Sequence, residues 1–374
     1  MRPAFSNPRQ AAAFALLLLL LLASPLLATK KVMPPREQIY SSTSWFWGSY
    51  PYLDEQIFKE TNEIDIAFVG SSRGWYDMDT PYLQKELSRH SGRDVTVLNL
   101  CWLWAGFDAT YFIVKDLLDH RKVKMLVFSD EQSEGVKGNR FDFHRSQCMS
   151  YRWFRYCDGA DDLAGLSLQN QASLYAGAIL GIPRNLLCLV RTNLTRDIDP
   201  DHKTFVNLQF HSPDPTRRLG ALCSRMSYDE DPEFVPYHPQ PISPLPEPVT
   251  YSAGTRTNFQ FIGPPTQSME LYFFKRFVAL ARLHGVKLVM IHYPLASETS
   301  VLDRIPEREC WPEEIDTNLT LIGFPPARLF AGMTPTEQLR LFCNHFHLNQ
   351  NGQEYFNPLI APRLISLYEA ETSH

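Results

Sequence analysis

The feature that most restricts the fold of this chain is an alternation of strand and helix patterns between residues 64 and 129. Three short apolar runs have the length and the β-branched content of buried strands: IDIAFVG (64–70), VTVLNL (95–100) and VKMLVFS (123–129). Helical patterns separate them, one from Thr80 to about Gly92 and one over 108–120. Strands and helices that alternate with short links predict a parallel sheet covered by helices.

The ends of these helices are marked in the sequence. Thr80 is expected to cap the first helix, with Pro81 at its first position and Gly92 just past its end. The alternation resumes after residue 265 with four further segments: a helix over 266–285, a strand over 286–294, a weaker strand over 318–324, and a final helix that Asn349 can cap and that Pro358 and Pro362 are expected to kink. The predicted fold is a parallel α/β sheet covered by helices.

The N-terminal sequence indicates that the protein is exported. Arg2 and Arg9 precede an apolar run from Ala11 to Ala28, which lies near the lower limit of roughly 17–25 residues for a membrane-spanning helix. The apolar core also suits a signal peptide, but Leu26-Leu27-Ala28 departs from the usual small-residue cleavage pattern. We therefore interpret residues 1–29 as a signal anchor or a signal peptide, with the uncleaved anchor favoured.

The rest of the chain divides into two parts. Residues 30–60 read as an irregular, aromatic-rich lead-in, and residues 61–374 as one α/β domain. An insertion at about 140–262 interrupts that domain, and its later part is dense in proline.

Composition excludes several classes of function. With 44% hydrophobic residues among 374, the chain can bury a large core. A formal net charge of −5 without a basic stripe argues against nucleic-acid binding. The seven cysteines include no CxxC pair, so we expect no metal site. Nothing in the sequence calls for another cofactor.

Polar segments follow the predicted strands at the end of a parallel sheet where ligands bind. They include Gly70-Ser71-Ser72-Arg73 and Asn99-Leu100-Cys101, while Asn344-His345-Phe346-His347 precedes the last helix. A serine nucleophile needs a base within hydrogen-bond reach and a group that orients that base. Ser72 and His347 can supply the nucleophile and the base if the fold brings them together.

At this point the residues resemble a known family. FVGSSRGW near the start, together with HLNQNG before the last helix, is similar to the SGNH (GDSL-type) hydrolase superfamily. It resembles more closely the membrane-anchored branch that includes alginate O-acetyltransferase-type proteins and the D-alanyl-lipoteichoic acid biosynthesis protein. The resemblance covers roughly 64–130 and 266–370, about half of the chain. It implies a three-layer, flavodoxin-like α/β sheet with helices on both faces, interrupted by a large irregular and helical insertion.

The resemblance implies roles for particular residues. Ser72 is the implied nucleophile and His347 the implied base, with His345 as an alternative base. Asn344 stands where the family has aspartate. Either its amide oxygen orients the imidazole, or Ser72 and the histidine act as a dyad without an orienting residue. The implied oxyanion donors are the backbone N–H groups of Ser72 and Cys101, and Cys101 stands where the family has glycine. The family's third-block asparagine has no match, and Gln132 or Ser129 can substitute for it.

These residues can also have structural roles. Ser72 can be a turn or capping residue, and His347 can position the last helix. We expect Arg73 to pair with Asp77, and we interpret Asp130 as a solvated carboxylate at the rim of the site.

The resemblance implies an exported serine esterase or O-acyltransferase. Its substrate would be an acylated small molecule or a cell-envelope polysaccharide, and a membrane acyltransferase is a candidate partner. The implied location is the bacterial cell envelope, anchored and facing the periplasm or the exterior, or secreted if the N-terminal segment is cleaved. The alternative is a catalytically inactive protein of the same fold that binds or assembles envelope glycan-modifying components.

Overall fold

The computed structural model describes residues 7–27, 50–101, 106–130, 165, 167–168, 236–237, 249–251, 268–298 and 319–372. The chain divides into two compact units, one of residues 1–44 with 140–199 and one of residues 45–139 with 200–374. In the first unit the main described element is α1 (Pro8–Leu27). Most of the predicted insertion lies outside the described residues.

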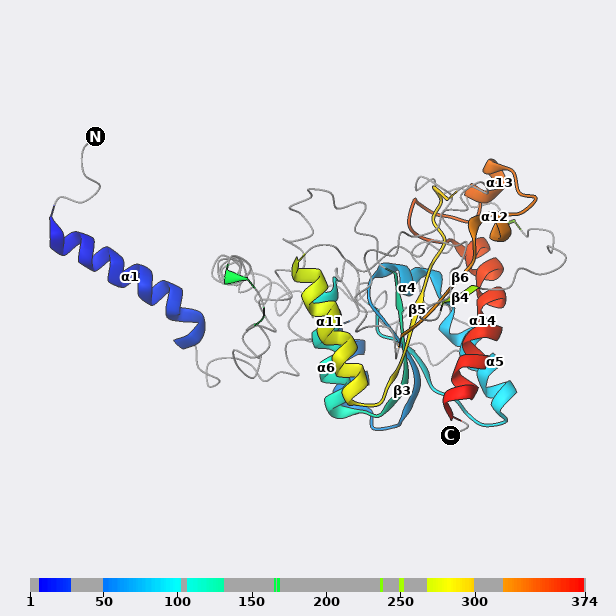
Figure 1. Cartoon of the computed structure of the whole chain (residues 1–374), viewed down its shortest axis with the longest axis horizontal. Helices are drawn as coiled ribbons and strands as arrows, with labels where there is room; N and C mark the ends of the chain where they lie inside the picture. The colour runs from blue at the N-terminus through cyan, green and yellow to red at the C-terminus, as the bar shows by residue number, and fades with distance from the viewer. Residues whose placement is uncertain are drawn as a thin grey trace, which may run out of the picture. The chain divides into compact units, whose positions relative to one another are not determined.

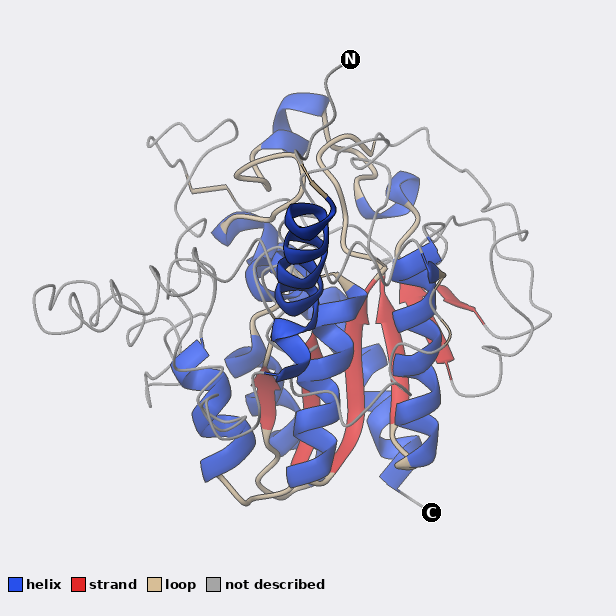
Figure 2. Ribbon diagram, turned by 90° about the vertical axis from the view of Figure 1, so that its left-hand side faces the viewer, coloured by secondary structure: helices blue, strands red, loops and turns tan. Residues whose placement is uncertain are grey.

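The second unit contains the predicted parallel sheet (Figure 2). Among the described residues it has six strands in the order β2-β1-β3-β5-β6-β4. Their bounds are β1 Ile64–Val69, β2 Val97–Asn99, β3 Val123–Ser129, β4 Val249–Tyr251, β5 Lys287–Ile291 and β6 Leu319–Gly323. The first five strands in that order are parallel, and β4 joins β6 as an antiparallel edge. The α/β class and the parallel sheet are thus confirmed, and the strand order is consistent with a flavodoxin-like layout.

Long helices cover both faces of the sheet (Figure 1). On one face α6 (Phe107–His120) packs with α11 (Ser268–Leu283), and on the other α5 (Thr80–Ser91) packs with α14 (Gln350–Thr372). Between α6, α11 and β3 the rings of Phe107, Phe128, Phe274 and Phe277 meet edge to face, with centroids 4.8–6.1 Å apart. Such aromatic contacts add to the burial that holds helices on a sheet.

The described part of this unit also has short helices, among them α4 (Ser72–Asp77), α12 (Pro326–Leu329) and α13 (Pro335–Leu339). The irregular lead-in expected up to residue 60 is helical at its end, with α3 (Tyr50–Asp54) and the π-helical η2 (Glu55–Lys59). The reason is burial, since Leu53 and Ile57 are fully enclosed.

Helix ends follow the predicted chemistry with one shift. Asp79, and not Thr80, caps α5, and its side chain accepts the N–H of Tyr82 at 3.0 Å. Asn349 accepts the N–H of Gly352 at 3.2 Å at the start of α14, as predicted. That helix runs on through Pro358 and Pro362 to Thr372.

Helix α1 carries the polyleucine run, and the side chains of Leu16 to Leu20 are exposed. No helix in the described part of the chain has both the length and the hydropathy required to cross a membrane. The predicted anchor or signal peptide stays a prediction.

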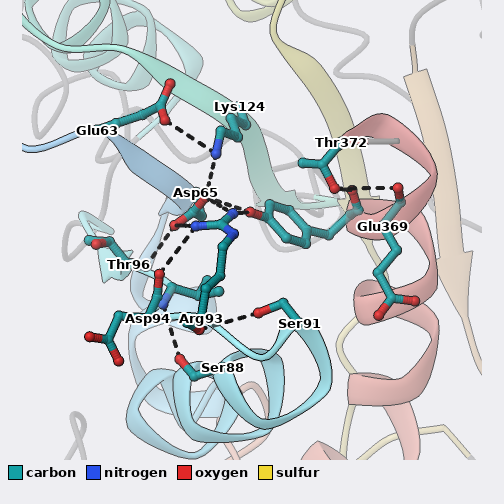
Figure 3. A network of polar contacts seen from close by, with 12 residues as sticks. Glu63, Asp65, Ser88, Ser91, Arg93, Asp94, Thr96, Lys124, Glu369 and Thr372 are labelled. Atoms are coloured by element: carbon teal, nitrogen blue, oxygen red, sulfur yellow. Dashed lines mark hydrogen bonds and ion pairs between the residues drawn. The ribbon is translucent and has the colours of Figure 1, made fainter. Parts of the chain in front are cut away.

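A cluster of charged residues lies at the end of the sheet where β1 begins (Figure 3). The Asp65 carboxylate binds Arg93 Nη2 at 2.7 Å, Lys124 Nζ at 2.8 Å and the backbone N–H of Thr96 at 2.9 Å. The hydroxyl of Tyr368, on α14, donates to the same carboxylate at 2.5 Å. Burial raises the pKa of Asp65, but these donors outweigh it and hold the pKa well below its ordinary value.

This cluster predicts a specific dependence of stability on pH. Because the folded-state pKa of Asp65 is depressed, its contribution to stability is fully present above the unfolded value of about 3.9 and is lost progressively as pH falls from there through the folded-state pKa. We expect Asp65→Asn to lower the free energy of unfolding by about 2 kcal/mol at pH 7, and by less at pH 3. Urea unfolding at the two pH values checks this. Glu63→Gln, which alters an exposed ion pair to Lys124, should change little, and an equal loss at both pH values would contradict the prediction.

Candidate functional site

The first component of the site is the turn between β1 and α4. Gly70 has φ 116°, a left-handed conformation that glycine adopts without strain. Ser71 caps α4, with its hydroxyl accepting the N–H of Arg73 at 3.4 Å. Ser72 is then the first residue of the helix and is half-buried. The local sequence therefore places the Ser72 hydroxyl at the carboxyl end of β1.

The second component comes from the loop between α13 and α14. His347 lies on this loop, and its Nε2 is 2.8 Å from the hydroxyl oxygen of Ser72, 275 residues away in sequence. The ring of Tyr76, on α4, meets the imidazole edge-on with centroids 4.7 Å apart. The fold thus brings the predicted nucleophile and the predicted base into direct contact.

Asn344 fixes the orientation of that imidazole. Its Oδ1 lies 3.0 Å from His347 Nδ1 and also accepts the backbone N–H groups of Phe346 at 2.9 Å and His347 at 3.0 Å. Backbone N–H groups can only donate, so the atom that faces them must be the amide oxygen. That oxygen requires the proton of His347 to be on Nδ1. Nε2 is therefore free of hydrogen and accepts the hydroxyl proton of Ser72.

The imidazole is held in its neutral form. Burial lowers the pKa of His347 to about 3, and the positive charge of Arg73 acts in the same direction. A neutral imidazole can accept a proton over most of the pH range, although a lowered pKa also makes it a weaker base.

Arg73, the residue after Ser72, is the first of a series of interacting charged residues. Its guanidinium donates to the carbonyl of Tyr293 and lies 3.7 Å from Asp130 Oδ1. Asp130 binds His292 Nδ1 at 2.5 Å, and His292 Nε2 binds Glu298 at 2.7 Å. Burial lowers the pKa of His292, but the two carboxylates outweigh it and raise the pKa to about 10.

These contacts correct two expectations, one about the exposure of Asp130 and one about the ion-pair partner of Arg73. Asp130 is 1% exposed, not a solvated rim carboxylate, because His292 and Arg73 compensate its charge. The ion pair of Arg73 is with Asp130, while Asp77 receives only its longer-range electrostatic influence. His292 and Glu298 were not predicted as site residues, because His292 fell within the strand predicted over 286–294; in the structure that strand, β5, ends at Ile291 and His292 directly follows it.

The two predicted oxyanion donors, the backbone N–H groups of Ser72 and Cys101, differ in whether they are already hydrogen-bonded. The N–H of Ser72 belongs to the first turn of α4, where backbone donors lack partners within the helix. The N–H of Cys101 already donates to Asn99 Oδ1 at 3.2 Å, and Asn99 Nδ2 donates to the carbonyl of Gly74 at 2.9 Å. An oxyanion would have to displace Asn99 before it could use the Cys101 amide.

The remaining predicted residues lie elsewhere. His345 is exposed, and its carbonyl accepts the N–H of Ala296 at 3.2 Å. Gln132 lies outside the described residues. Among the described residues no group of His, Cys, Asp and Glu side chains is arranged to hold a metal ion. Comparisons of the chain with family models, curated proteins and solved structures found no match.

Proposed function

We propose that this chain is a serine-dependent esterase or O-acyltransferase. The observation that carries the proposal is the continuous hydrogen-bonded series from Ser72 through His347 to Asn344, with distances of 2.8 and 3.0 Å. The series has a nucleophile, a base in the correct tautomer and an orienting group, which are the parts that serine acyl transfer requires.

The chemistry follows from these contacts. The Ser72 oxygen attacks an acyl carbonyl while its proton passes to Nε2 of His347. The imidazolium then returns the proton to the departing alcohol, which leaves an acyl group on Ser72. The same imidazole then removes a proton from the acceptor, which is water in an esterase and a hydroxyl in a transferase, as the acceptor oxygen attacks the acyl carbonyl. The bond between the acyl group and Ser72 breaks, and the imidazolium returns the proton to the Ser72 oxygen. Asn344 keeps Nδ1 protonated throughout, and the Ser72 N–H supports the oxyanion.

The fold supports an SGNH-type assignment within this proposal. The parallel strands follow the flavodoxin-like order, and the site lies at their carboxyl ends, where such sheets bind ligands. Ser72 follows the first strand and His347 precedes the last helix, as the resemblance implies. With the apolar N-terminal segment, we infer an exported protein of the bacterial cell envelope that acts on an acylated polysaccharide or a smaller ester.

Three observations favour the second candidate, a protein of this fold that binds without catalysing. Asparagine replaces a carboxylate as the orienting group, the pKa of His347 is low, and the Cys101 amide is already bonded. Such a protein would bind envelope glycan or a membrane acyltransferase through the same face.

A fluorophosphonate probe separates the two candidates. We expect the wild type to form one adduct, which peptide mass spectrometry places on Ser72, and Ser72→Ala to form none. Ser71→Ala is the matched control, because it removes only a helix cap worth about 1 kcal/mol and should still be labelled. A folded wild type that stays unlabelled would reject catalysis and favour the binding protein.

A further inference from the structure

Asp77 is a buried carboxyl to which the proposed reaction gives no role. It is the last residue of α4, the helix that begins at Ser72, and its side chain is 0% exposed. Its Oδ1 accepts the backbone N–H of Leu348 at 2.8 Å. Leu348 directly follows His347, so the helix that presents the nucleophile also holds the peptide group next to the base.

The end of α4 that carries Asp77 is itself fixed by α14. Gln353 donates through Nε2 to the carbonyl of Tyr76, and Asn357 Nδ2 donates to the carbonyl of Asp77 at 3.0 Å. Asn357 Oδ1 accepts the N–H of Asp79 at 2.9 Å. These side chains leave Asp77 little freedom to move relative to α14.

Leu348 is also tightly enclosed. It pairs with Phe342 in an isolated antiparallel bridge and is 1% exposed. A Cβ added to Gly352 would lie 2.9 Å from Leu348 Cβ and closer still to its Cδ2, so α14 packs directly against this side chain. The carbonyl of His347 accepts the N–H of Cys343 at 3.0 Å. The main chain around the base is therefore held on both sides.

The Asp77 carboxyl serves this contact as a neutral acceptor. Burial raises its pKa to about 8, against the opposing effects of Arg73 and the Leu348 N–H. Its Oδ2 has no hydrogen-bond partner among the described residues. A charged carboxylate with so few donors is costly in the interior. An asparagine in this position would offer Leu348 the same carbonyl oxygen without a charge.

We propose that Asp77 is the positioning residue that sets His347 against Ser72, through its hydrogen bond to the Leu348 amide. The inference rests on the proposed function and extends it. Loss of this hydrogen bond frees the peptide after the base, and a displacement of about 1 Å at a reacting group can slow a reaction by about 10².

The rate of fluorophosphonate labelling at Ser72, measured per folded molecule, tests the proposal. Asp77→Leu removes the acceptor at similar volume, and we expect labelling to slow by about 10²-fold. Asp77→Asn keeps the acceptor and should stay within about threefold of the wild type. Labelling of Asp77→Leu at the wild-type rate would overturn the proposal, and so would an equal loss in Asp77→Asn.

Asp65→Asn is the matched control. Asp65 is another buried aspartate that accepts a backbone N–H, at the opposite end of β1. Its replacement should lower stability but leave the labelling rate within about threefold, which separates positioning from a general loss of stability. If Asp77→Leu does not fold, Asp77→Ala takes its place, with the same expected loss.

Hydrogen exchange distinguishes failure of this inference from failure of the proposed function. The Leu348 amide should exchange faster in Asp77→Leu than in the wild type, and at the wild-type rate in Asp77→Asn. A folded wild type that the probe does not label overturns the proposed function, whereas the exchange result still decides whether Asp77 holds the loop. Unchanged protection of Leu348 in Asp77→Leu would reject the positioning role even if the wild type is catalytic.

Discussion

His347→Gln is expected to lower kcat for a short aryl ester by about 10⁴-fold or more, because no other described side chain contacts the Ser72 hydroxyl from the position of a base. Glutamine can hydrogen-bond to Ser72 but cannot take its proton. The measurement is the steady-state release of the aryl alcohol at pH 7, with near-ultraviolet circular dichroism to confirm folding. Adding Ser72→Ala to this variant should cause little further loss, because the two residues act as one unit.

His345→Gln is the matched control for this result. His345 lies two residues away on the same loop and is exposed, and we expect its replacement to leave kcat within about threefold. A loss in His345→Gln as large as in His347→Gln would contradict the assignment of the base and restore His345 as a candidate.

The second large effect is expected at Asn344. Asn344→Leu removes an oxygen that accepts three hydrogen bonds, two from backbone N–H groups and one from the imidazole. The imidazole then loses both its tautomer and its orientation, and we expect kcat to fall by about 10³–10⁴-fold, as when the wrong tautomer is held in other serine triads. The ester assay used for His347 measures this loss.

Asn344→Asp is the variant to compare with Asn344→Leu, because it keeps the acceptor oxygen. Aspartate keeps the three acceptor contacts and adds a negative charge beside Nδ1, which raises the pKa of His347 from about 3. We expect kcat at pH 7 to hold or to rise, and the acid limb of the kcat/KM profile to move to higher pH. A collapse of activity in Asn344→Asp would show that the amide has a different role, such as a contact to the substrate.

The elements of the fold that could be predicted are those that residues in one short segment of sequence determine. The strand from Ile64 to Val69 is buried at every position, so its run of apolar residues, interrupted only by Asp65, sufficed to predict it. The cap of α5 was placed one residue late, because Asp79 and Thr80 are both capable caps and sequence does not rank them. The helices at 50–59 were missed because aromatic residues in a lead-in do not reveal that the domain encloses them.

The candidate site could be predicted in part for a similar reason. Ser72 and His347 stand beside recognisable strand and helix boundaries, so their positions at the edge of the sheet follow from topology. The buried contacts of His292 depend on Asp130 and Glu298, which reach it from different segments. Asp77 likewise acquires its contact with Leu348 only when the loop before α14 closes over α4.

The sequence by itself determined the alternation of elements, the parallel sheet, and the residues that stand at its carboxyl edge, because these follow from periodicity and turn chemistry within short stretches. Only the tertiary structure decided that Asn344 presents its oxygen to Nδ1, that Asp130 is buried in ion pairs, and that the Cys101 amide is already bonded. Hydrogen-bond partners and desolvation depend on groups that come together through space, and no short stretch of sequence specifies those groups.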